Sequence, residues 1–277
     1  MKNTSIFILG HNGMLGQMAA YYFAKKGYKI QTSTERFNAI DHQKLIDQVK
    51  SSKCDYVFNC IGKIKQKTDD VNQLIWANAI LPLELINKLD SQKQLLIQPS
   101  TDCVFSGKKG DFYSNSDFSD AKDDYGWSKR LGEVALLNKP NVLIIRVSII
   151  GLDKSTEPKG LLGWFLSNKP NSLITGFTNH LWNGITTLEW CKQVDKLLKS
   201  NYLQPNLGKI IHLGTVEYYS KFEMLNLFQE KFATNYSIQA HEHQEYIDRR
   251  LKPDFISPDL SQQVKELADL NAEWNQK

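Results

Sequence analysis

The chain has 277 residues with 41% hydrophobic and 23% charged side chains, which is typical of a soluble globular protein with one large domain or two closely joined ones. Its 34 basic and 30 acidic residues give a net charge of +4, too small to indicate a nucleic-acid partner. Neither a signal peptide nor a membrane-spanning stretch is recognised, and four scattered cysteines without a CxxC pair indicate neither disulfides nor a metal site, so we expect a cytoplasmic protein.

Strands and helices alternate through the first 150 residues. Apolar runs predict buried strands, and apolar side chains at helical spacing predict the helices between them. The expected strands are 5–9, 28–34, 56–60, 95–98 and 142–150, and the expected helices are 14–26, 41–51, 71–89 and 124–138. This order predicts an α/β fold with a Rossmann-type, doubly wound parallel sheet over residues 1–150, and the glycines between the first strand and the first helix make it an expected NAD(P)-binding domain.

The alternation weakens after Gly151. Helices are expected at 161–166, 188–198, 220–232 and from residue 260 onward, with one late strand at 209–213. We therefore expect residues 151–277 to form mainly a smaller α/β substrate lobe. Segments around 185–215 should be interwoven with the first domain.

A glycine-rich turn joins the first strand to the first helix. Its glycines permit a tight turn and close approach of the backbone to a pyrophosphate, which would face the free N–H groups of the helix. The spacing Gly-x-x-Gly-x-x-Gly departs from the usual Gly-x-Gly-x-x-Gly, and a turn without a ligand is the alternative. The residues predicted to hold a dinucleotide here are Gly10, Asn12, Gly13, Met14, Leu15 and Gly16.

The end of the second strand is where the cofactor's ribose is recognised. An acidic residue there favours NAD, whereas an arginine favours the 2′-phosphate of NADP. Ser33 and Arg36 favour NADP(H), while Glu35 keeps NAD(H) as the alternative.

Thr101, Tyr125 and Lys129 form a set that can deliver a proton. Thr101 follows the fourth strand, and Tyr125 and Lys129 are four residues apart on an expected helix, so they share one face. The lysine ammonium should lower the tyrosine pKa, and the tyrosine would then protonate a carbonyl oxygen that Thr101 orients. The order of glycine turn, hydroxyl and Tyr-x-x-x-Lys predicts a nicotinamide-dependent reductase.

These motifs resemble those of the extended short-chain dehydrogenase/reductases, and most closely the dTDP-4-dehydrorhamnose reductase group. The likeness covers most of the chain. It is carried by the glycine turn and by Asn59-Cys60-Ile61-Gly62, Ser100-Thr101-Asp102-Cys103-Val104-Phe105, Tyr125-Gly126-Trp127-Ser128-Lys129, Arg146-Val147-Ser148 and Gly184-Ile185-Thr186-Thr187.

The resemblance implies that Thr101, Tyr125 and Lys129 are catalytic and that Cys60, Ile61 and Gly62 line the cofactor. It further implies reduction of the 4-keto group of a UDP- or dTDP-linked 6-deoxy hexose, with a hydroxyl or an acetamido group at C2, in deoxysugar biosynthesis. A homodimer is the expected assembly. The predicted substrate contacts are Thr101, Asp102, Val104 and Phe105, with Trp164 and Asn183 from the C-terminal lobe.

Cys103 stands where the rhamnose reductases usually have tyrosine. Two related groups, the GDP-fucose synthases and the plant-type nucleotide-rhamnose epimerase/reductases, resemble this chain here and use the cysteine as an acid/base that exchanges a proton beside the keto group. A thiol suits this role because its pKa is easily tuned. The partner acid would be Lys159, then Lys154, with His180 as a further candidate. The alternative is that Cys103 is a small apolar filler.

Other functions remain open for this fold. One is a nucleotide-sugar epimerase that retains NAD⁺, and another is a 4,6-dehydratase, although only Asp102 supplies a carboxyl group after Thr101. A third is a non-catalytic regulatory subunit, because the regulatory subunit of methionine adenosyltransferase resembles the same family.

Overall fold

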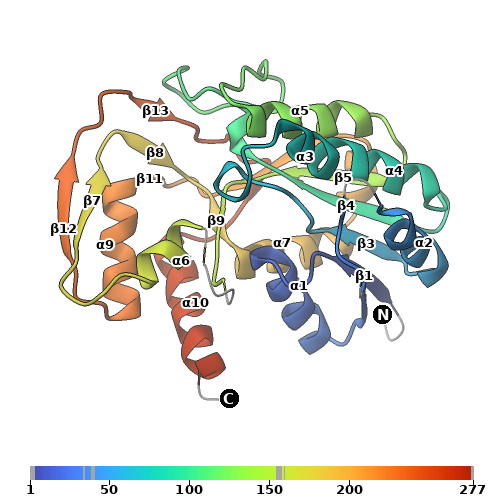
Figure 1. The fold of residues 1–277 in the computed structure, drawn as a ribbon, viewed down its shortest axis with the longest axis horizontal. Helices are drawn as coiled ribbons and strands as arrows, with labels where there is room; N and C mark the ends of the chain where they lie inside the picture. The colour runs from blue at the N-terminus through green and yellow to red at the C-terminus, as the bar shows by residue number, and fades with distance from the viewer. Residues whose placement is uncertain (1–3, 34, 39–40, 154–157, 159, 276–277) are drawn as a thin grey trace.

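The computed structural model describes residues 4–33, 35–38, 41–153, 158 and 160–275. Its centre is a seven-stranded sheet in which every adjacent pair of strands is parallel (Figure 1). The strand order is β14 (Phe255–Ile256), β10 (Ile210–Gly214), β5 (Val142–Arg146), β4 (Leu95–Ser100), β3 (Tyr56–Asn59), β1 (Ser5–Leu9) and β2 (Lys29–Thr32). The prediction of a doubly wound parallel sheet is confirmed.

The central strands are apolar on both faces because helices cover both. In β1, Ile6 and Ile8 join one hydrophobic cluster, whereas Phe7 and Leu9 join the cluster on the opposite face. Successive side chains of a strand point to opposite faces, so a continuous apolar run is what a sheet covered on both sides requires.

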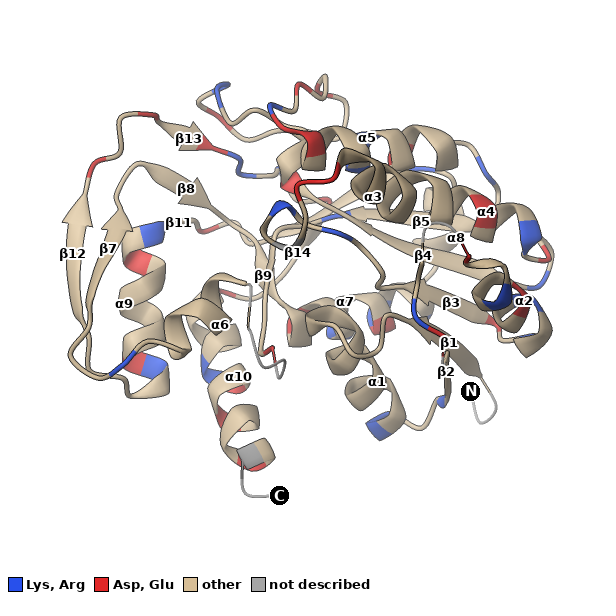
Figure 2. Ribbon diagram, in the orientation of Figure 1, with Lys and Arg blue, Asp and Glu red and all other residues tan. Residues whose placement is uncertain are grey.

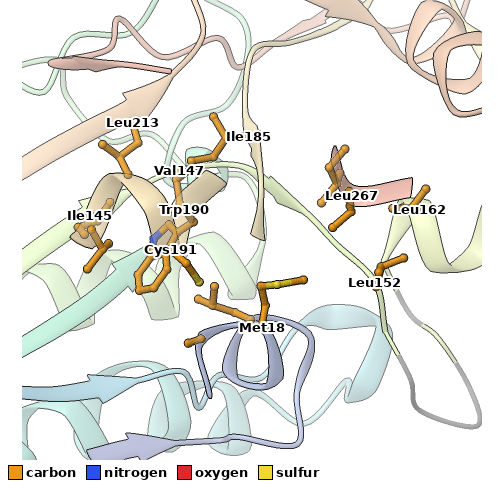
Figure 3. Close-up of a cluster of buried hydrophobic side chains, with 14 of the residues drawn as sticks. Met18, Ile145, Val147, Leu152, Leu162, Ile185, Trp190, Cys191, Leu213 and Leu267 are labelled. Carbon is orange, nitrogen blue, oxygen red and sulfur yellow. The ribbon is translucent and has the colours of Figure 1, made fainter. Parts of the chain in front are cut away.

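One face is covered by α2 (Gln43–Ser52), α3 (Val71–Ile75), α4 (Leu81–Lys88) and α5 (Asp124–Leu136) (Figure 1). The other face is covered by α1 (Met14–Lys25) and α7 (Thr187–Leu198), which contact each other. Trp190 of α7 is fully buried and packs edge-on against Phe58 of β3, with ring centroids 5.9 Å apart. Figure 3 shows Trp190 and Cys191 meeting Met18 of α1 and Ile145 of β5.

The C-terminal region, where the structure describes it, shares one hydrophobic cluster with the central sheet. Its helices are α6 (Leu161–Leu166), α8 (Leu203–Asn206), α9 (Lys221–Phe232) and α10 (Leu260–Asn275), and its small sheets contain β6 (Ile149–Ile150), β7 (Leu173–Phe177), β8 (His180–Trp182), β9 (Ile185–Thr186), β11 (Tyr219–Ser220), β12 (Ser237–His241) and β13 (Ile247–Asp248). Leu162, Phe165 and Phe228 belong to the same cluster as Trp190, and Leu267 joins them (Figure 3). The lobe is therefore packed onto the sheet's α1/α7 face.

The sequence missed most of these small strands. Several have only two residues, and β12 is largely exposed, so neither an apolar run nor a clear alternation marks them. The β12 strand forms by pairing in parallel with β7 over five residues. Such long-range pairing leaves little local signal.

Two expected elements are interrupted where the functional residues lie. The strand expected over 142–150 ends at Arg146, and Ile149–Ile150 pairs instead with β9. The helix expected over 71–89 contains a π-helix, η2 (Trp76–Ile80). A Cβ on Gly132 of α5 would lie only 2.1 Å from the Asn78 carbonyl oxygen, so this glycine lets α5 pack closely on η2.

A buried ion pair joins α5 to the sheet. Arg146 Nε donates to Glu133 Oε1 and Arg146 Nη2 donates to Glu133 Oε2, both at 2.7 Å, and each side chain is about 1% exposed. The Ser100 hydroxyl donates to the same Oε1 atom at 2.7 Å. One carboxylate therefore fixes the ends of β4 and β5 against α5.

Within the described part of the chain, no helix is both long and apolar enough to cross a membrane. The same residues contain no group of three or more His, Cys, Asp or Glu side chains placed to hold a metal ion.

We expect Glu133→Gln to lower the free energy of unfolding by about 3–5 kcal/mol, because the substitution leaves the Arg146 guanidinium buried without a counter-charge. Urea unfolding at pH 7 measures the change. Glu230→Gln is the matched control, since Glu230 pairs with Lys231 at the surface and should matter by less than about 0.5 kcal/mol. A loss below about 1 kcal/mol for Glu133→Gln would contradict the role given to this pair.

Candidate active site

A cavity of about 350 Å³ lies at the carboxyl ends of the central strands. This edge of an open parallel sheet is where such folds bind ligands. The walls come from the turn before α1, the loop after β3, the end of β4, helix α5, the segment after β5 and the start of α6. The lining residues are Gly13, Met14, Leu15, Asn59, Cys60, Ile61, Gly62, Lys63, Ile64, Gln66, Pro99, Ser100, Thr101, Asp102, Cys103, Tyr125, Lys129, Val147, Ser148, Ile149, Gly160 and Leu161.

The glycine turn has the geometry that a dinucleotide site needs. Gly10 has φ of +71°, and a Cβ there would lie 2.9 Å from backbone atoms of Cys60 and Ile61. A Cβ on Gly16 would lie 2.1 Å from the Gly10 carbonyl oxygen. Helix α1 begins after Gly13 without a side-chain cap, so its first N–H groups and positive dipole end are free for an anion.

The catalytic candidates Thr101, Tyr125 and Lys129 line the same cavity. Tyr125 lies in the first turn of α5, whose N-terminus is capped by Asp123 accepting a hydrogen bond from Gly126 N at 2.8 Å. A Cβ on Gly126 would lie 2.2 Å from the Cys103 carbonyl oxygen, so this glycine lets the helix start against the turn that carries Thr101. The Thr101 side chain lies close enough to the Tyr125 phenol to act on its pKa.

Thr101 is the N-cap residue of a short 3₁₀ helix, η3 (Asp102–Val104). Thr101 Oγ1 accepts from Cys103 N at 3.1 Å and donates to Asp102 Oδ1 at 3.0 Å. The Cys103 thiol points to the same Asp102 Oδ1 atom, with Sγ 3.7 Å away. Asp102 therefore orients both the hydroxyl and the thiol.

Lys129 extends from α5 toward the backbone of two loops. Its Nζ lies 3.5 Å from the Pro99 carbonyl oxygen, and a Cβ on Gly62 would approach Nζ to 3.3 Å. Burial lowers the pKa of Lys129 to about 8, which the nearby Glu133 carboxylate only partly opposes. The ammonium group is therefore close to losing its proton at physiological pH.

The pKa of Tyr125 is not lowered in this structure but lies above its ordinary value, so the net effect expected from Lys129 is not seen. Burial is the main cause of a raised pKa for Tyr125, and the negative charges near Cys103 and Asp102 add to it, while the hydrogen bond with Thr101 acts in the opposite direction. The phenol is therefore protonated at rest, which is the form that can donate a proton.

Cys103 lies at the cavity wall rather than in the apolar interior. The pKa of its thiol is raised to about 12, chiefly by burial and then by Asp102, while Arg249 and the hydrogen bond with Thr101 act in the opposite direction. The resting group is thus a thiol that can give a proton. Its role as an acid/base stays a prediction.

Two predicted substrate contacts point away from the cavity. Val104 and Phe105 are fully buried, and Phe105 stacks on Tyr113 with ring centroids 4.1 Å apart. The η3 turn directs these side chains into a small core under the loop, so the prediction for both is corrected.

Neither of the two predicted C-terminal contacts lines this cavity, and their contact with a substrate stays a prediction. Asn183 is buried and braces the lobe: its Nδ2 donates to the carbonyl oxygens of Thr215 and Leu251, and its Oδ1 accepts from Leu251 N. Trp164 lies on α6, is 43% exposed and does not line the cavity.

Of the predicted acid partners of Cys103, His180 is the one that the structure describes. Lys154 and Lys159 lie outside the described residues. His180 is buried on β8, and burial and the neighbouring Lys221 lower its pKa to about 4, so it is neutral.

Residues predicted to bind the cofactor lie at two cavities. Gly13, Met14, Leu15, Cys60, Ile61 and Gly62 line the catalytic cavity, Gly10 and Gly16 shape its turn, and Asn12 is exposed beside it. Arg36 lies in a second cavity of about 550 Å³, which shares Lys63 with the first and also contains Trp76. Ser33 is buried and donates to Gln48 Oε1 at 2.6 Å, and its cofactor contact stays a prediction.

Several cavity residues were not predicted as site residues. Asn59 has a buried Oδ1 atom without a hydrogen-bond partner, and Ser148 lies where β5 breaks. Lys63 has its backbone held by the Asn78 side chain, whose Nδ2 donates to Lys63 O at 2.9 Å and whose Oδ1 accepts from Lys63 N at 3.1 Å. In the sequence, Lys63 is marked only as a basic residue that follows the third expected strand.

Comparison with known proteins agrees with this geometry. The family model described as the RmlD substrate binding domain matches residues 4–277. A curated relative, the probable low-salt glycan biosynthesis reductase Agl14 of Haloferax volcanii, is 25% identical over 158 residues, which are 52% of this chain and 53% of the relative. The match thus spans about half the length of that relative.

The fold is shared with several solved structures. The dTDP-4-dehydrorhamnose reductase of Bacillus anthracis in complex with NADP has a TM-score of 0.82 at 15% identity, covering 96% of this chain and 98% of that one. MlghC, the GDP-mannoheptose C4 reductase of Campylobacter jejuni with NADP bound, has a TM-score of 0.76 at 14% identity, covering 100% and 99%. The dTDP-glucose 4,6-dehydratase of Bacillus anthracis in complex with NAD also has a TM-score of 0.76 at 14% identity, covering 98% of each chain.

We expect Lys129→Met to stabilise the protein by about 1–2 kcal/mol at pH 7, because it removes an ammonium that the folded state disfavours. In the unfolded chain this lysine has a pKa near 10.5, so the unfolded state binds more protons between pH 8 and 10.5. The advantage of the variant should therefore shrink as pH rises through that window. Urea unfolding at pH 7 and pH 10 measures it.

The exposed Lys88→Met on α4 is the control and should change stability by less than about 0.5 kcal/mol at both pH values. If Lys129→Met destabilises the protein at pH 7, or its effect does not depend on pH, the low lysine pKa is wrong.

Proposed function

We infer the function from the premise that the chain belongs to the RmlD substrate binding domain family, since that family's model covers residues 4–277, as the sequence motifs predicted. We propose that the protein is an NADPH-dependent reductase of the 4-keto group of a nucleotide-activated 6-deoxy hexose. The observation that carries this proposal is the convergence of Thr101, Tyr125 and Lys129 in one cavity beside the uncapped start of α1.

The residues present fit a bound dinucleotide. The close packing at Gly10 and Gly16 clears space in front of α1, and the orphaned Asn59 Oδ1 is an acceptor that a ligand can satisfy. Gly13, Met14 and Leu15 would face the pyrophosphate, and Cys60, Ile61 and Gly62 would line the rest. We propose that residues 1–150 bind the cofactor and that residues 151–277 mainly bind the substrate.

Arg36 supports NADP(H) over NAD(H). It shares its cavity with Lys63, so two cations are available to a 2′-phosphate at the end of β2. NADP-bound neighbours of the same fold are consistent with this choice, and NAD(H) is the alternative that Glu35 keeps open.

The chain's own residues supply the proton chemistry. The bound nicotinamide would supply the hydride for the carbonyl carbon. Tyr125 then donates its phenolic proton to the carbonyl oxygen, so that the ketone becomes an alcohol, and the Thr101 hydroxyl holds that oxygen in line. Lys129 stabilises the phenolate left on Tyr125 until solvent returns a proton.

We extend the proposal to epimerisation through Cys103. The predicted partner on the opposite face, Lys159 or then Lys154, would in its neutral form take a proton from a carbon next to the keto group. The electron pair moves to the carbonyl oxygen as an enolate, and reprotonation from the other face inverts the carbon. The Cys103 thiol lines the same cavity as Tyr125 and is protonated at rest, so it is suited to be the donor in the second step. The identity of the sugar, a homodimeric assembly and a cytoplasmic location stay predictions.

Product analysis by NMR tests both halves of this function. The protein is incubated with UDP- or dTDP-linked 4-keto-6-deoxy sugar in heavy water, first without and then with NADPH. We expect deuterium at C3 or C5 before reduction and a 4-hydroxy sugar after it. Cys103→Ser should lose at least tenfold in deuterium incorporation and keep the reduction of the keto group.

If no deuterium is incorporated, or if incorporation is unchanged in Cys103→Ser, the proposed epimerisation is wrong. The proposed reduction of the keto group would not be affected by that result. Failure to oxidise NADPH with either substrate would count against the reductase for these sugars, and tightly retained NAD⁺ in the purified protein would favour an epimerase.

A further inference from the structure

An arginine from the C-terminal lobe reaches the catalytic turn. Arg249 follows β13 and its Nε donates to the Phe105 carbonyl oxygen at 3.0 Å. Its Nη1 lies 3.7 Å from Cys103 Sγ. In Figure 2, the basic segment that follows β13 runs back toward the loop before α5.

The backbone on both sides of this contact is fixed. Asp248 N donates to the Gly107 carbonyl oxygen at 2.9 Å. A Cβ on Gly107 would come within 3.1 Å of Arg249 Cγ and 2.9 Å of an Ile247 methyl group. Gly107, with φ of +80°, therefore lets the 247–249 segment lie directly against the turn after Cys103.

The two adjacent arginines are neutralised differently. Arg250 is paired by two hydrogen bonds with Asp248, at 2.8 and 2.7 Å, and stacks between the rings of Phe112 and Tyr218. Arg249 has no carboxylate partner among the residues that the structure describes. Its charge is directed instead at a peptide carbonyl and a thiol.

We propose that Arg249 is a positioning residue for Cys103: its guanidinium, anchored on the Phe105 carbonyl, orients the thiol and stabilises the negative sulfur that remains when the proton leaves. The C-terminal lobe would thereby complete the acid/base group of the other lobe. This inference rests on the epimerisation proposed above, in which the Cys103 S–H bond breaks as a C–H bond forms on the substrate.

The charges around the thiol show why a cation is needed there. Negative neighbours and burial oppose the loss of the proton, and Arg249 is the leading cation on the opposite side. The titratable and charged groups that face Cys103 are Asp102, Asp123 and Tyr125 from its own lobe, and Lys221 and Arg249 from the C-terminal lobe. Lys221 is the first residue of α9, so a second cation accompanies Arg249.

Alkylation of Cys103 by iodoacetamide measures the thiolate without needing any sugar substrate. The rate at Cys103 is followed by peptide mass spectrometry between pH 7.5 and 9.5, with the fully buried Cys54 and Cys191 as internal controls. Arg249→Gln keeps a donor for the Phe105 carbonyl but removes the charge, whereas Arg249→Lys keeps the charge. Lys252→Gln, an exposed cation on the same segment, is the matched control.

We expect Arg249→Gln to slow alkylation of Cys103 at least tenfold at every pH, which corresponds to a rise in the thiol pKa of one unit or more. Arg249→Lys should stay within about threefold of the wild type, and Lys252→Gln should match it. A rate for Arg249→Gln within twofold of the wild type would overturn the proposal. If Arg249→Lys is alkylated as slowly as Arg249→Gln, the positive charge of Arg249 does not act on the thiol and Arg249 contributes only packing contacts, which would also overturn the proposal.

Thermal melting of each variant checks that it is folded, and Arg249→Met repeats the neutral substitution if the glutamine variant is unstable. Deuterium incorporation by the wild type separates this inference from the function on which it rests. If Arg249→Gln slows alkylation while the wild type incorporates no deuterium, the proposed epimerisation is wrong, but the proposal that Arg249 positions the Cys103 thiol is supported.

Discussion

The buried ion pair between Glu133 and Arg146 is the constraint on which the candidate site depends. Tyr125, Lys129 and Glu133 follow one another at four-residue spacing, so they lie on one face of α5. Glu133 also accepts a hydrogen bond from Ser100, the residue before Thr101. Fixing this carboxylate therefore sets the distance between the helix that carries the phenol and the strand end that carries the hydroxyl.

The site combines this rigid frame with unfavourable charges. The Lys129 ammonium is buried with its Nζ 3.5 Å from the Pro99 carbonyl oxygen, Asn59 has an orphaned oxygen, and Cys103 lies beside Asp102. Each arrangement costs stability in the free protein, and each can be relieved by a bound ligand or a transferred proton. The contribution from the C-terminal lobe is cationic, through Arg249 and Lys221, and it acts on the Cys103 thiol beside Asp102.

Local sequence predicted the parts of this arrangement that depend on short spacings. The apolar runs predicted the sheet because both its faces are covered, and the glycine turn and Tyr125/Lys129 were found because their members are a few residues apart. Arg249, Asn78 and Ser148 were missed because their contacts join distant segments. Phe105 was misplaced because adjacency to Thr101 does not reveal that a 3₁₀ turn directs its side chain inward.

The central claim is that the Tyr125 phenol protonates the substrate's keto oxygen in this cavity. Steady-state oxidation of NADPH with dTDP-4-keto-6-deoxyglucose, compared between the wild type and Tyr125→Phe, tests it most directly. The account predicts a loss of kcat by about 10²–10⁴-fold, the contribution typical of a general acid, with NADPH binding unchanged within about threefold by fluorescence titration. A Tyr125→Phe variant that keeps kcat within a few-fold of the wild type would contradict the account.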